Sequence, residues 1–269
     1  MKRANENYSR EHLAYLKKLR KNKILITTFR WLILALILVT WELLAHYEVV
    51  NPFITSSPSR VFKTIGSLYQ SGELMKHIGI TLGETLAGFF IAVIAGYLIA
   101  VILWSSETVR AIVEPYIVVL NSLPKIALGP LIIIWIGTGY TAIIFMTVIV
   151  AIILCIMNTL AGFIAVDSTK LTLMKAMGAG RLTTLTKLII PASLPALMNT
   201  LKVAVGLAWI GSIMGEYIAS RAGLGYLIVY GGQVMKLDLV MTSTFILCVL
   251  AGCMYGIIAV IERIVVKQF

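Results

Sequence analysis

The chain has 269 residues, of which 59% are hydrophobic and 13% are charged. Soluble domains carry roughly 45–50% apolar and about 25% charged residues, so this composition excludes an ordinary soluble domain and predicts a polytopic membrane protein. The net charge of +11 would also suit nucleic-acid binding, but the basic residues flank apolar segments, where anionic headgroups attract them by about 1 kcal/mol each. We therefore expect membrane lipid as a partner and no nucleic acid.

Six segments are long and apolar enough to cross a bilayer, which takes about 20 residues of helix. Three windows carry no charge, namely 85–106, 126–166 and 239–261, and the middle one is long enough for two crossings with a turn at Gly137-Thr138-Gly139. Spans that contain charged residues cover 24–45, 113–136 and 188–219, and the second of these overlaps the first crossing of the 126–166 window. Because backbone groups in lipid must bond internally, and a barrel would show short alternating segments, we predict an all-α fold with six transmembrane helices.

Basic residues give the expected orientation, since short translocated loops avoid Lys and Arg. With the N-terminus inside, 15 basic residues fall on cytoplasmic segments and 5 on the opposite side. Both termini are therefore expected in the cytoplasm. The resulting division is a basic amphipathic tail at 1–23 and a transmembrane domain at 24–269. The first apolar run is longer than that of a signal peptide, so it is expected to remain as an anchor.

Two shorter helices are expected on the outer side. Ser57 and Pro58 suit the cap and first turn of an interfacial helix. Residues 221–238 are too short and too broken to cross the bilayer, and they predict a short helix or a re-entrant turn.

Small residues recur every four positions in three of the expected spans, a spacing that lets helix backbones approach closely in lipid. We expect tight helix-helix seams at these positions, which are Gly88, Ala92, Gly96 and Ala100, then Gly211 and Gly215, then Gly252 and Gly256.

A basic segment lies between the fourth and fifth expected spans. Asp167 suits the start of a helix that runs to Met177, and Gly178 suits a left-handed turn after it. A second helix is expected from about Arg181, ending before Pro191. The result would be a hinged helix pair.

This helix pair has two interpretations. A run of charge is usually a solvated loop. Four apolar residues favour instead a compact projection that needs a partner groove, and they are Leu171, Leu173, Met174 and Met177.

No catalytic motif is present in the sequence. There is no G-x-x-x-x-G-K-[ST] and no H-E-x-x-H, and the scattered histidines allow no nucleophile-base pair. The three cysteines lie in apolar spans without C-x-x-C spacing. We expect no enzymatic activity, no metal and no cofactor in this chain.

Ionisable residues inside spans are expensive and usually face a bundle interior or a water-filled cavity. Lys125 lies between Pro124 and Pro130, which predicts a broken helix around a cation. That lysine either lines a path or is held at an interface or by another helix, and the two readings stay open. Glu42 and Glu84 are further candidates.

Lys202 and Glu216 share a predicted helix but are 14 residues apart, which is about 21 Å along its axis. They are therefore not expected to pair. Glu216 is expected to be exposed to water or bound to a loop, with a role in substrate passage as a further possibility.

The chain resembles the membrane permeases of bacterial ABC importers, in the group that handles nitrate, sulfonates and taurine. The resemblance runs from about residue 40 to the C-terminus. It is carried by Trp41-Glu42-Leu43-Leu44, Ser57-Pro58-Ser59, LPKIALGPLIIIWIGTG at 123–139, NTLAG at 158–162, MGAGR at 177–181, IIPASLPALMNTLKVAVGLAW at 189–209 and GLGYLI at 223–228.

The resemblance implies the type I importer fold and a coupling segment at 167–187 that docks into a cytoplasmic ATPase. The implied contact residues are Thr172, Leu173, Met174, Lys175, Ala176, Gly178, Ala179 and Gly180. The family's Glu-Ala-Ala positions are Thr172, Leu173 and Met174 here, so the usual glutamate is absent. Coupling would then depend on apolar fit and backbone contacts or on an adapted ATPase, with threonine giving a hydrogen bond in place of an ion pair.

The resemblance also implies the partners and the path. The partners would be a dimer of ABC ATPases that binds ATP and Mg²⁺, a second copy of this chain, and an extracytoplasmic solute-binding protein, all at a bacterial inner membrane. Pro124, Lys125, Lys202 and Glu216 are the residues expected along the translocation path. The Pro-Lys-x-Ala-Leu-x-Pro-Leu sequence around Lys125 looks more like that of permeases for pyrimidine or flavin-related vitamin precursors. Nitrate and sulfonate permeases commonly have Pro-Pro at this place.

Two other functions compete with this reading. One is a secondary transporter driven by an ion gradient, with Glu42, Glu84 or Glu216 carrying a proton. Such carriers often show inverted repeats and more helices, which this sequence lacks. The other is a scaffold that recruits soluble proteins without transporting anything.

Overall fold

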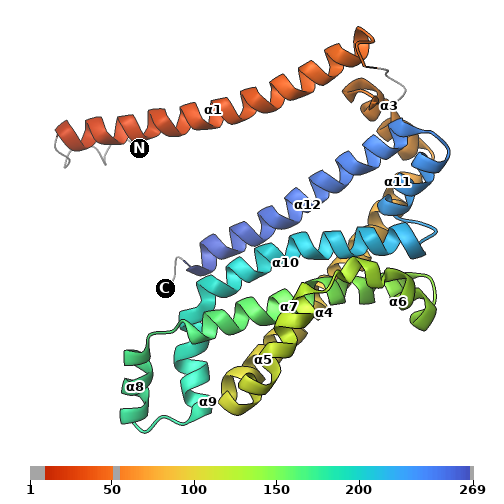
Figure 1. Cartoon of the computed structure of the whole chain (residues 1–269). Coiled ribbons are helices and arrows are strands. Elements are labelled where there is room, and N and C mark those ends of the chain that lie inside the picture. Colours follow the sequence, from red (N-terminus) through yellow and green to blue (C-terminus); the bar gives the residue numbers. More distant parts are fainter. Residues whose placement is uncertain (1–9, 51–54, 267–269) are drawn as a thin grey trace. The chain divides into compact units, whose positions relative to one another are not determined.

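The computed structural model describes residues 10–50 and 55–266, and every regular element in those ranges is a helix. The prediction of an all-α fold is confirmed. The chain divides between Lys63 and Thr64 into two compact units, each described by itself (Figure 1).

The first unit contains the long helix α1, Arg10–His46, and the start of α3, Pro58–Gln70. α1 passes through residue 23, where the charge pattern ends the basic tail, without a break. Residues 1–9 of that tail lie outside the described residues.

Two of the sequence motifs that carry the family resemblance lie in this unit, and hydrogen bonds join them. The indole Nε1 of Trp41 donates to the carbonyl of Thr55 at 3.3 Å. The Glu42 carboxylate accepts from the backbone N–H and the hydroxyl of Ser59, at 3.0 and 2.8 Å. Ser57 caps α3 as predicted, because its Oγ accepts from Arg60 N at 3.4 Å. The end of α1 and the start of α3 are thereby tied together.

The second unit holds the remaining elements. They are α4 (Glu73–Ser105), α5 (Glu107–Ser122), the 3₁₀ helix η1 (Lys125–Leu128), α6 (Gly129–Ile136), α7 (Tyr140–Ile164), α8 (Ser168–Ala176), α9 (Arg181–Thr184), the π-helix η2 (Leu185–Ile189), α10 (Ile190–Ala219), α11 (Leu224–Gln233) and α12 (Leu237–Val266).

Five helices of the described chain are long and apolar enough to cross a membrane, and they lie within α1, α4, α7, α9–α10 and α12. The remaining predicted span, 113–136, is a bent pair of helices, because α5 and η1–α6 meet at 84°. Pro124 lies at this break, where its missing N–H cannot continue the helical bonding of α5. The predicted break around Lys125 is therefore present. α3 and α11 are short helices, as predicted from their sequences.

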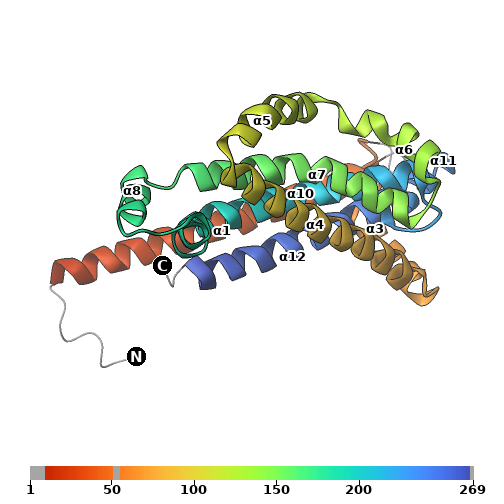
Figure 2. The ribbon, with the colours of Figure 1, turned by 90° about the horizontal axis from the view of Figure 1, so that it is seen from below.

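α7 packs between α4 and α10, and the small residues predicted for this role lie in both seams (Figures 1 and 2). A Cβ on Gly96 of α4 would lie 2.7 Å from Cys155 Cβ of α7. A Cβ on Gly211 of α10 would lie 2.6 Å from Thr147 Cα of α7. α4 and α10 also contact each other directly, because Thr85 and Ser212 share a hydrogen bond of 2.7 Å.

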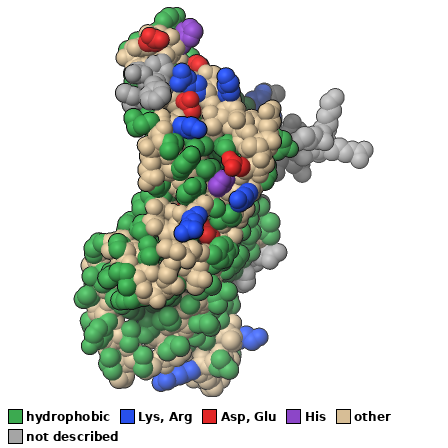
Figure 3. Space-filling view, turned by 90° about the vertical axis from the view of Figure 1, so that its right-hand side faces the viewer, with side chains coloured by type: hydrophobic (Ala, Val, Ile, Leu, Met, Phe, Trp, Pro, Cys, Tyr) green, Lys and Arg blue, Asp and Glu red, His purple; other side chains and the backbone are tan. Residues whose placement is uncertain are grey.

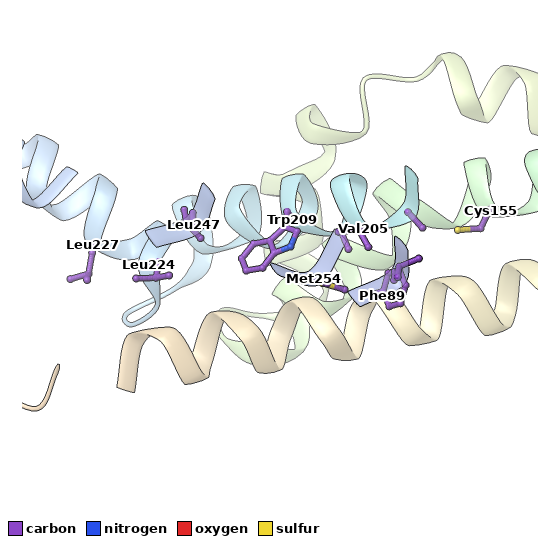
Figure 4. Close-up of a cluster of buried hydrophobic side chains, with 11 residues drawn as sticks. Phe89, Cys155, Val205, Trp209, Leu224, Leu227, Leu247 and Met254 are labelled. Atoms are coloured by element: carbon purple, nitrogen blue, oxygen red, sulfur yellow. The ribbon is translucent and has the colours of Figure 1, made fainter. Parts of the chain in front are cut away.

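The largest part of the core joins five helices of this unit. Figure 4 shows its side chains in a close-up. Phe89 of α4, Trp209 of α10 and Leu224 of α11 are among its buried side chains. Many large apolar side chains remain exposed, for example Trp135 at 73% and Ile134 at 76%. On the face drawn in Figure 3, charged side chains gather in the upper and middle part, and the lower part is mostly hydrophobic. Such a surface suits contact with lipid or with another apolar protein surface.

Two expectations about elements are wrong. Gly252 and Gly256 form no seam, because a Cβ on either would meet no packing partner within 4 Å in the described chain. The second helix of the basic segment does not end before Pro191, because α9, η2 and α10 run on without a gap. Pro191 lies in the first turn of α10, where a missing N–H is tolerated, and the π-turn directly before it accommodates the ring.

Candidate functional site

α8 is a short helix with a cap at each end. The Asp167 carboxylate accepts from Thr169 N at 2.8 Å, and this backbone N–H holds the pKa of Asp167 below its ordinary value. At the other end Gly178 has φ +76°, and Ala179 N donates to the Met174 carbonyl at 3.0 Å. The predicted start, end and left-handed turn are all present.

The apolar residues of this segment face two ways. Leu171 packs against the core cluster that contains Phe163 and Ile189. Leu173 and Met177 point away from the core and are 60% and 73% exposed. Leu182 of α9 is 74% exposed. The segment is therefore anchored on one side and presents unpaired apolar groups on the other.

The eight residues expected to contact an ATPase lie together on α8 and its C-terminal turn. Met174 and Ala179 are half-buried, and the other six are exposed, namely Thr172, Leu173, Lys175, Ala176, Gly178 and Gly180. The Thr172 hydroxyl donates to the Ser168 carbonyl within α8, at 3.0 Å.

The segment is attached to the helices around it. α8 follows α7 directly, and α9 continues through η2 into α10. Arg181, at the start of α9, donates from Nη1 to the carbonyl of Ser105 at the end of α4, at 3.1 Å. A displacement of α8 and α9 would thus be transmitted to α4, α7 and α10.

Glu216 takes part in a second polar group, at the opposite end of α10 from α9. Four successive backbone N–H groups at the start of α11 donate to side chains of α4 and α10. The bonds run from Gly223 N to His77 Nδ1 (2.9 Å), from Leu224 N to Thr81 Oγ1 (2.8 Å), and from Gly225 N and Tyr226 N to Glu216 Oε2 (2.6 and 3.3 Å). These are the donors that a helix start leaves without intrahelical partners.

The glycines of the GLGYLI motif make room for this arrangement. Gly223 has φ +112°, a conformation that favours glycine. A Cβ on Gly225 would lie 2.8 Å from Glu216 Oε2. The carboxyl groups of Glu84 of α4 and of Glu216 are both buried. The expected exposure of Glu216 to water is wrong, and its carboxylate binds the first turn of α11 where a loop was the expected partner.

The structure does not gather the four expected path residues into one site. Lys125 donates from Nζ to the carbonyl and the Oδ1 of Asn121, at 3.1 and 3.4 Å, across the break in its own span. Lys202 forms an ion pair with Glu262 of α12 and not with Glu216. Pro124 is exposed at the bend. The role of these residues in a path stays a prediction.

Sequence reasoning missed His77, Thr81 and Glu262. His77, Thr81 and Glu84 follow at intervals of four and three residues in an apolar stretch, so a polar stripe on one helical face was the available signal. Glu262 lies near the end of the last span and carried no comparable signal. In the described part of the chain, no three His, Cys, Asp or Glu side chains gather to hold a metal ion.

Comparison with known proteins shows which family and which relatives this chain is similar to. Residues 88–267 match the family model described as "Binding-protein-dependent transport system inner membrane component". The chain is 30% identical over 225 residues to a "Probable ABC transporter permease protein" of Haemophilus influenzae, covering 83% of this chain and 91% of that protein. It is 26% identical over 223 residues to the taurine transport system permease protein TauC of Escherichia coli, covering 81% of each.

Among solved structures, a chain of the MetNI methionine ABC transporter in an inward-facing conformation matches with a TM-score of 0.64. The identity is 21%, and the match covers 71% of this chain and 95% of that chain. At this identity the likeness concerns the fold, and it shows that the chain has the predicted type I fold.

Proposed function

This chain belongs to the family of binding-protein-dependent transport system inner membrane components, and we propose that it is the permease subunit of an ATP-driven importer for a small organic solute or anion. As a member of this family it is a multi-pass membrane protein and a transport subunit, not an enzyme. We place it in the inner membrane of a bacterium.

The observation that carries the proposal is the pair of exposed apolar side chains on α8 and at its C-terminal cap. Leu173 lies on α8 and Met177 is its C-cap residue, and this helix is capped at both ends, follows α7 and is tied to α4 through α9. Exposed apolar groups on a rigid projection are typical of a binding surface. We propose that segment 167–187 docks into a cytoplasmic ABC ATPase, which binds ATP and Mg²⁺ in its own chain.

Coupling would work through the connections of this segment. An ATPase can shift a conformational equilibrium only when it binds the two conformations with different affinity. Because α8 and α9 are joined to α7 and α10, whose small residues leave little space between them, a change at the docking surface would move these helices as bodies. Without the usual glutamate, the contact would consist of apolar fit, backbone groups and the Thr172 hydroxyl.

Two further partners belong to the proposal. A second copy of this chain would complete the path, since α5 and α6 leave apolar residues exposed, among them Tyr116, Val119 and Trp135. An extracytoplasmic binding protein would deliver the solute. Taurine, named for one relative, is an example of the proposed class of small charged organic solutes.

The docking surface can be tested by placing a charge on it. We expect Met177→Glu to reduce co-purification of the partner ABC ATPase roughly tenfold or more, as loss of a central contact does. The measurement is the ratio of ATPase to permease after affinity purification of the membrane complex. The control is Met235→Glu, which places the same charge on a methionine that is 58% exposed and outside the segment.

Equal ATPase recovery for both variants would contradict docking through α8. Gly178→Val gives an independent check, because valine is strained at φ +76°. Its uptake should fall while the amount of folded permease in the membrane stays measurable. Full uptake by Gly178→Val would count against a role for the turn.

A further inference from the structure

A cavity of about 720 Å³ opens beside the α8–α9 segment. Its lining comes from the ends of α4 and α7, the start of α5, and the inner side of α8 and α9. The exposed Leu173 and Met177, proposed to meet an ATPase, are not part of this lining. The cavity shares Lys175, Ala179 and Gly180 with the residues expected to contact the ATPase, but it does not include the exposed apolar pair.

The charged groups of the cavity are mostly cationic. Arg110, Lys175 and Arg181 line it, and Glu107 is the single carboxylate among its lining residues. Arg181 uses one N–H on the carbonyl of Ser105, and a guanidinium has five donors, so others remain for an anion. Thr108 also lines the cavity with a hydroxyl group, whereas the hydroxyls of Ser105 and Thr184 donate to the carbonyls of Val101 and Gly180. The polar part of the cavity therefore suits a phosphate group.

Three apolar residues of the lining lie at the ends of membrane spans. Trp104 is the second-last residue of α4, and Phe163 and Ile164 are the last two of α7. Tryptophan at the end of a span is typical of the membrane-water interface. An anion that also carries a long apolar chain would satisfy both parts of the lining, with its chain continuing along the spans.

We propose that this cavity binds the headgroup of an anionic phospholipid from the leaflet on the α8 side of the membrane. Basic pockets between membrane helices bind phosphate-bearing headgroups in this way. An acidic side chain of an ATPase would fit the cations equally well but would leave the apolar surface of Trp104 and Ile164 uncovered. Because Lys175 and Ala179 contribute to the lining, the bound lipid would support α8 from its inner side.

The test is native mass spectrometry of the full-length chain, purified without ATPase and titrated with phosphatidylglycerol or phosphatidylcholine. Phosphatidylglycerol should bind the wild type in preference to phosphatidylcholine. Arg110→Gln should weaken phosphatidylglycerol binding about fivefold, the effect of one basic group near an anionic headgroup. Arg110→Lys should keep most of the binding. The matched control is Lys187→Gln, which removes an exposed cation from the same part of the chain but outside the cavity lining.

Several outcomes would overturn the proposal. Equal binding of the two lipids by the wild type would do so without any variant, so the result does not depend on the folding of Arg110→Gln. Equal losses in Arg110→Gln and Lys187→Gln would show general surface attraction. Displacement of the lipid by millimolar inorganic phosphate would assign the cavity to free phosphate. Displacement by the purified ATPase would assign it to the protein partner.

Discussion

At the scale of single residues, Glu216 is the clearest case in which burial decides the role of an ionisable group. Its carboxylate is 1% exposed and accepts two backbone N–H groups from the start of α11. A carboxyl group in this position replaces the solvent that those donors would otherwise need. The carboxylate therefore holds α11 against α10, whatever further part it takes in transport.

Two substitutions of Glu216 distinguish its role as a hydrogen-bond acceptor from the effect of its charge. Glu216→Ala leaves the N–H groups of Gly225 and Tyr226 without their partner, and each unsatisfied buried donor costs roughly 1–3 kcal/mol. Glu216→Gln keeps an amide oxygen that can accept from the same groups, so it should be destabilised much less. Thermal unfolding of the two purified variants measures the difference. Equal stability of Glu216→Ala and the wild type would show that α11 is held by other contacts.

The same residues show which site features the sequence could predict. The capping roles of Gly178 and Asp167 could be predicted because a helix cap is local and involves groups only a few positions apart. The partner of Lys202 could not be predicted, because Glu262 is far from it in the sequence and meets it only through helix packing. The same holds for His77, which accepts from the distant backbone N–H of Gly223. Spacing excluded a bond between Lys202 and Glu216 but could not name the groups that each binds.

At the scale of elements, α7 is the centre of the second unit because its neighbours bring glycines to it from both sides. Thr147 of α7 faces Gly88 of α4 and Gly211 of α10. Spacing alone predicted three such seams, and the structure uses two, since Gly252 and Gly256 of α12 meet no packing partner in the described chain. A small-residue pattern indicates that a close approach is allowed, but the partner helix determines whether it occurs.

Two alanine substitutions distinguish a used glycine from an unused one. Gly211→Ala would place a Cβ 2.6 Å from the backbone of Thr147, and overpacking of this kind costs about 1–3 kcal/mol. Gly252→Ala meets no packing partner, and removal of a helical glycine should leave stability unchanged or slightly higher. Thermal unfolding of both purified variants measures the contrast. Equal destabilisation would mean that α12 packs closely against something absent from the described chain.

The break between α5 and α6 shows how far an element can be predicted from its residues. Pro124 and Pro130 remove backbone donors on either side of Lys125, so an interruption was expected. The 84° angle between the two halves was not, because it depends on how α6 packs against α7 and α10. The opposite case is Pro191, which was expected to end a helix and instead begins α10 after a π-turn.

At the scale of the whole molecule, the proposed function divides the work between chains. This polypeptide supplies membrane helices and a docking segment, and the energy would come from ATP bound elsewhere. The rival reading, an ion-driven carrier, would instead use a buried carboxyl group of this chain to take up a proton. Glu84 and Glu216 are buried together on α4 and α10, so the rival has a definite structural candidate.

The source of energy separates the two readings. We expect solute uptake into proteoliposomes to require the ATPase, the binding protein and ATP with Mg²⁺, and to continue when the membrane potential and the pH gradient are collapsed. Because an ATPase must discriminate between conformations to drive them, uptake should also fall in Met177→Glu in proportion to the lost ATPase. Accumulation by the permease alone under an imposed ion gradient, with loss in Glu84→Gln, would instead establish the carrier. The absence of any solute uptake in the fully assembled system, with ATPase turnover intact, would leave only the scaffold.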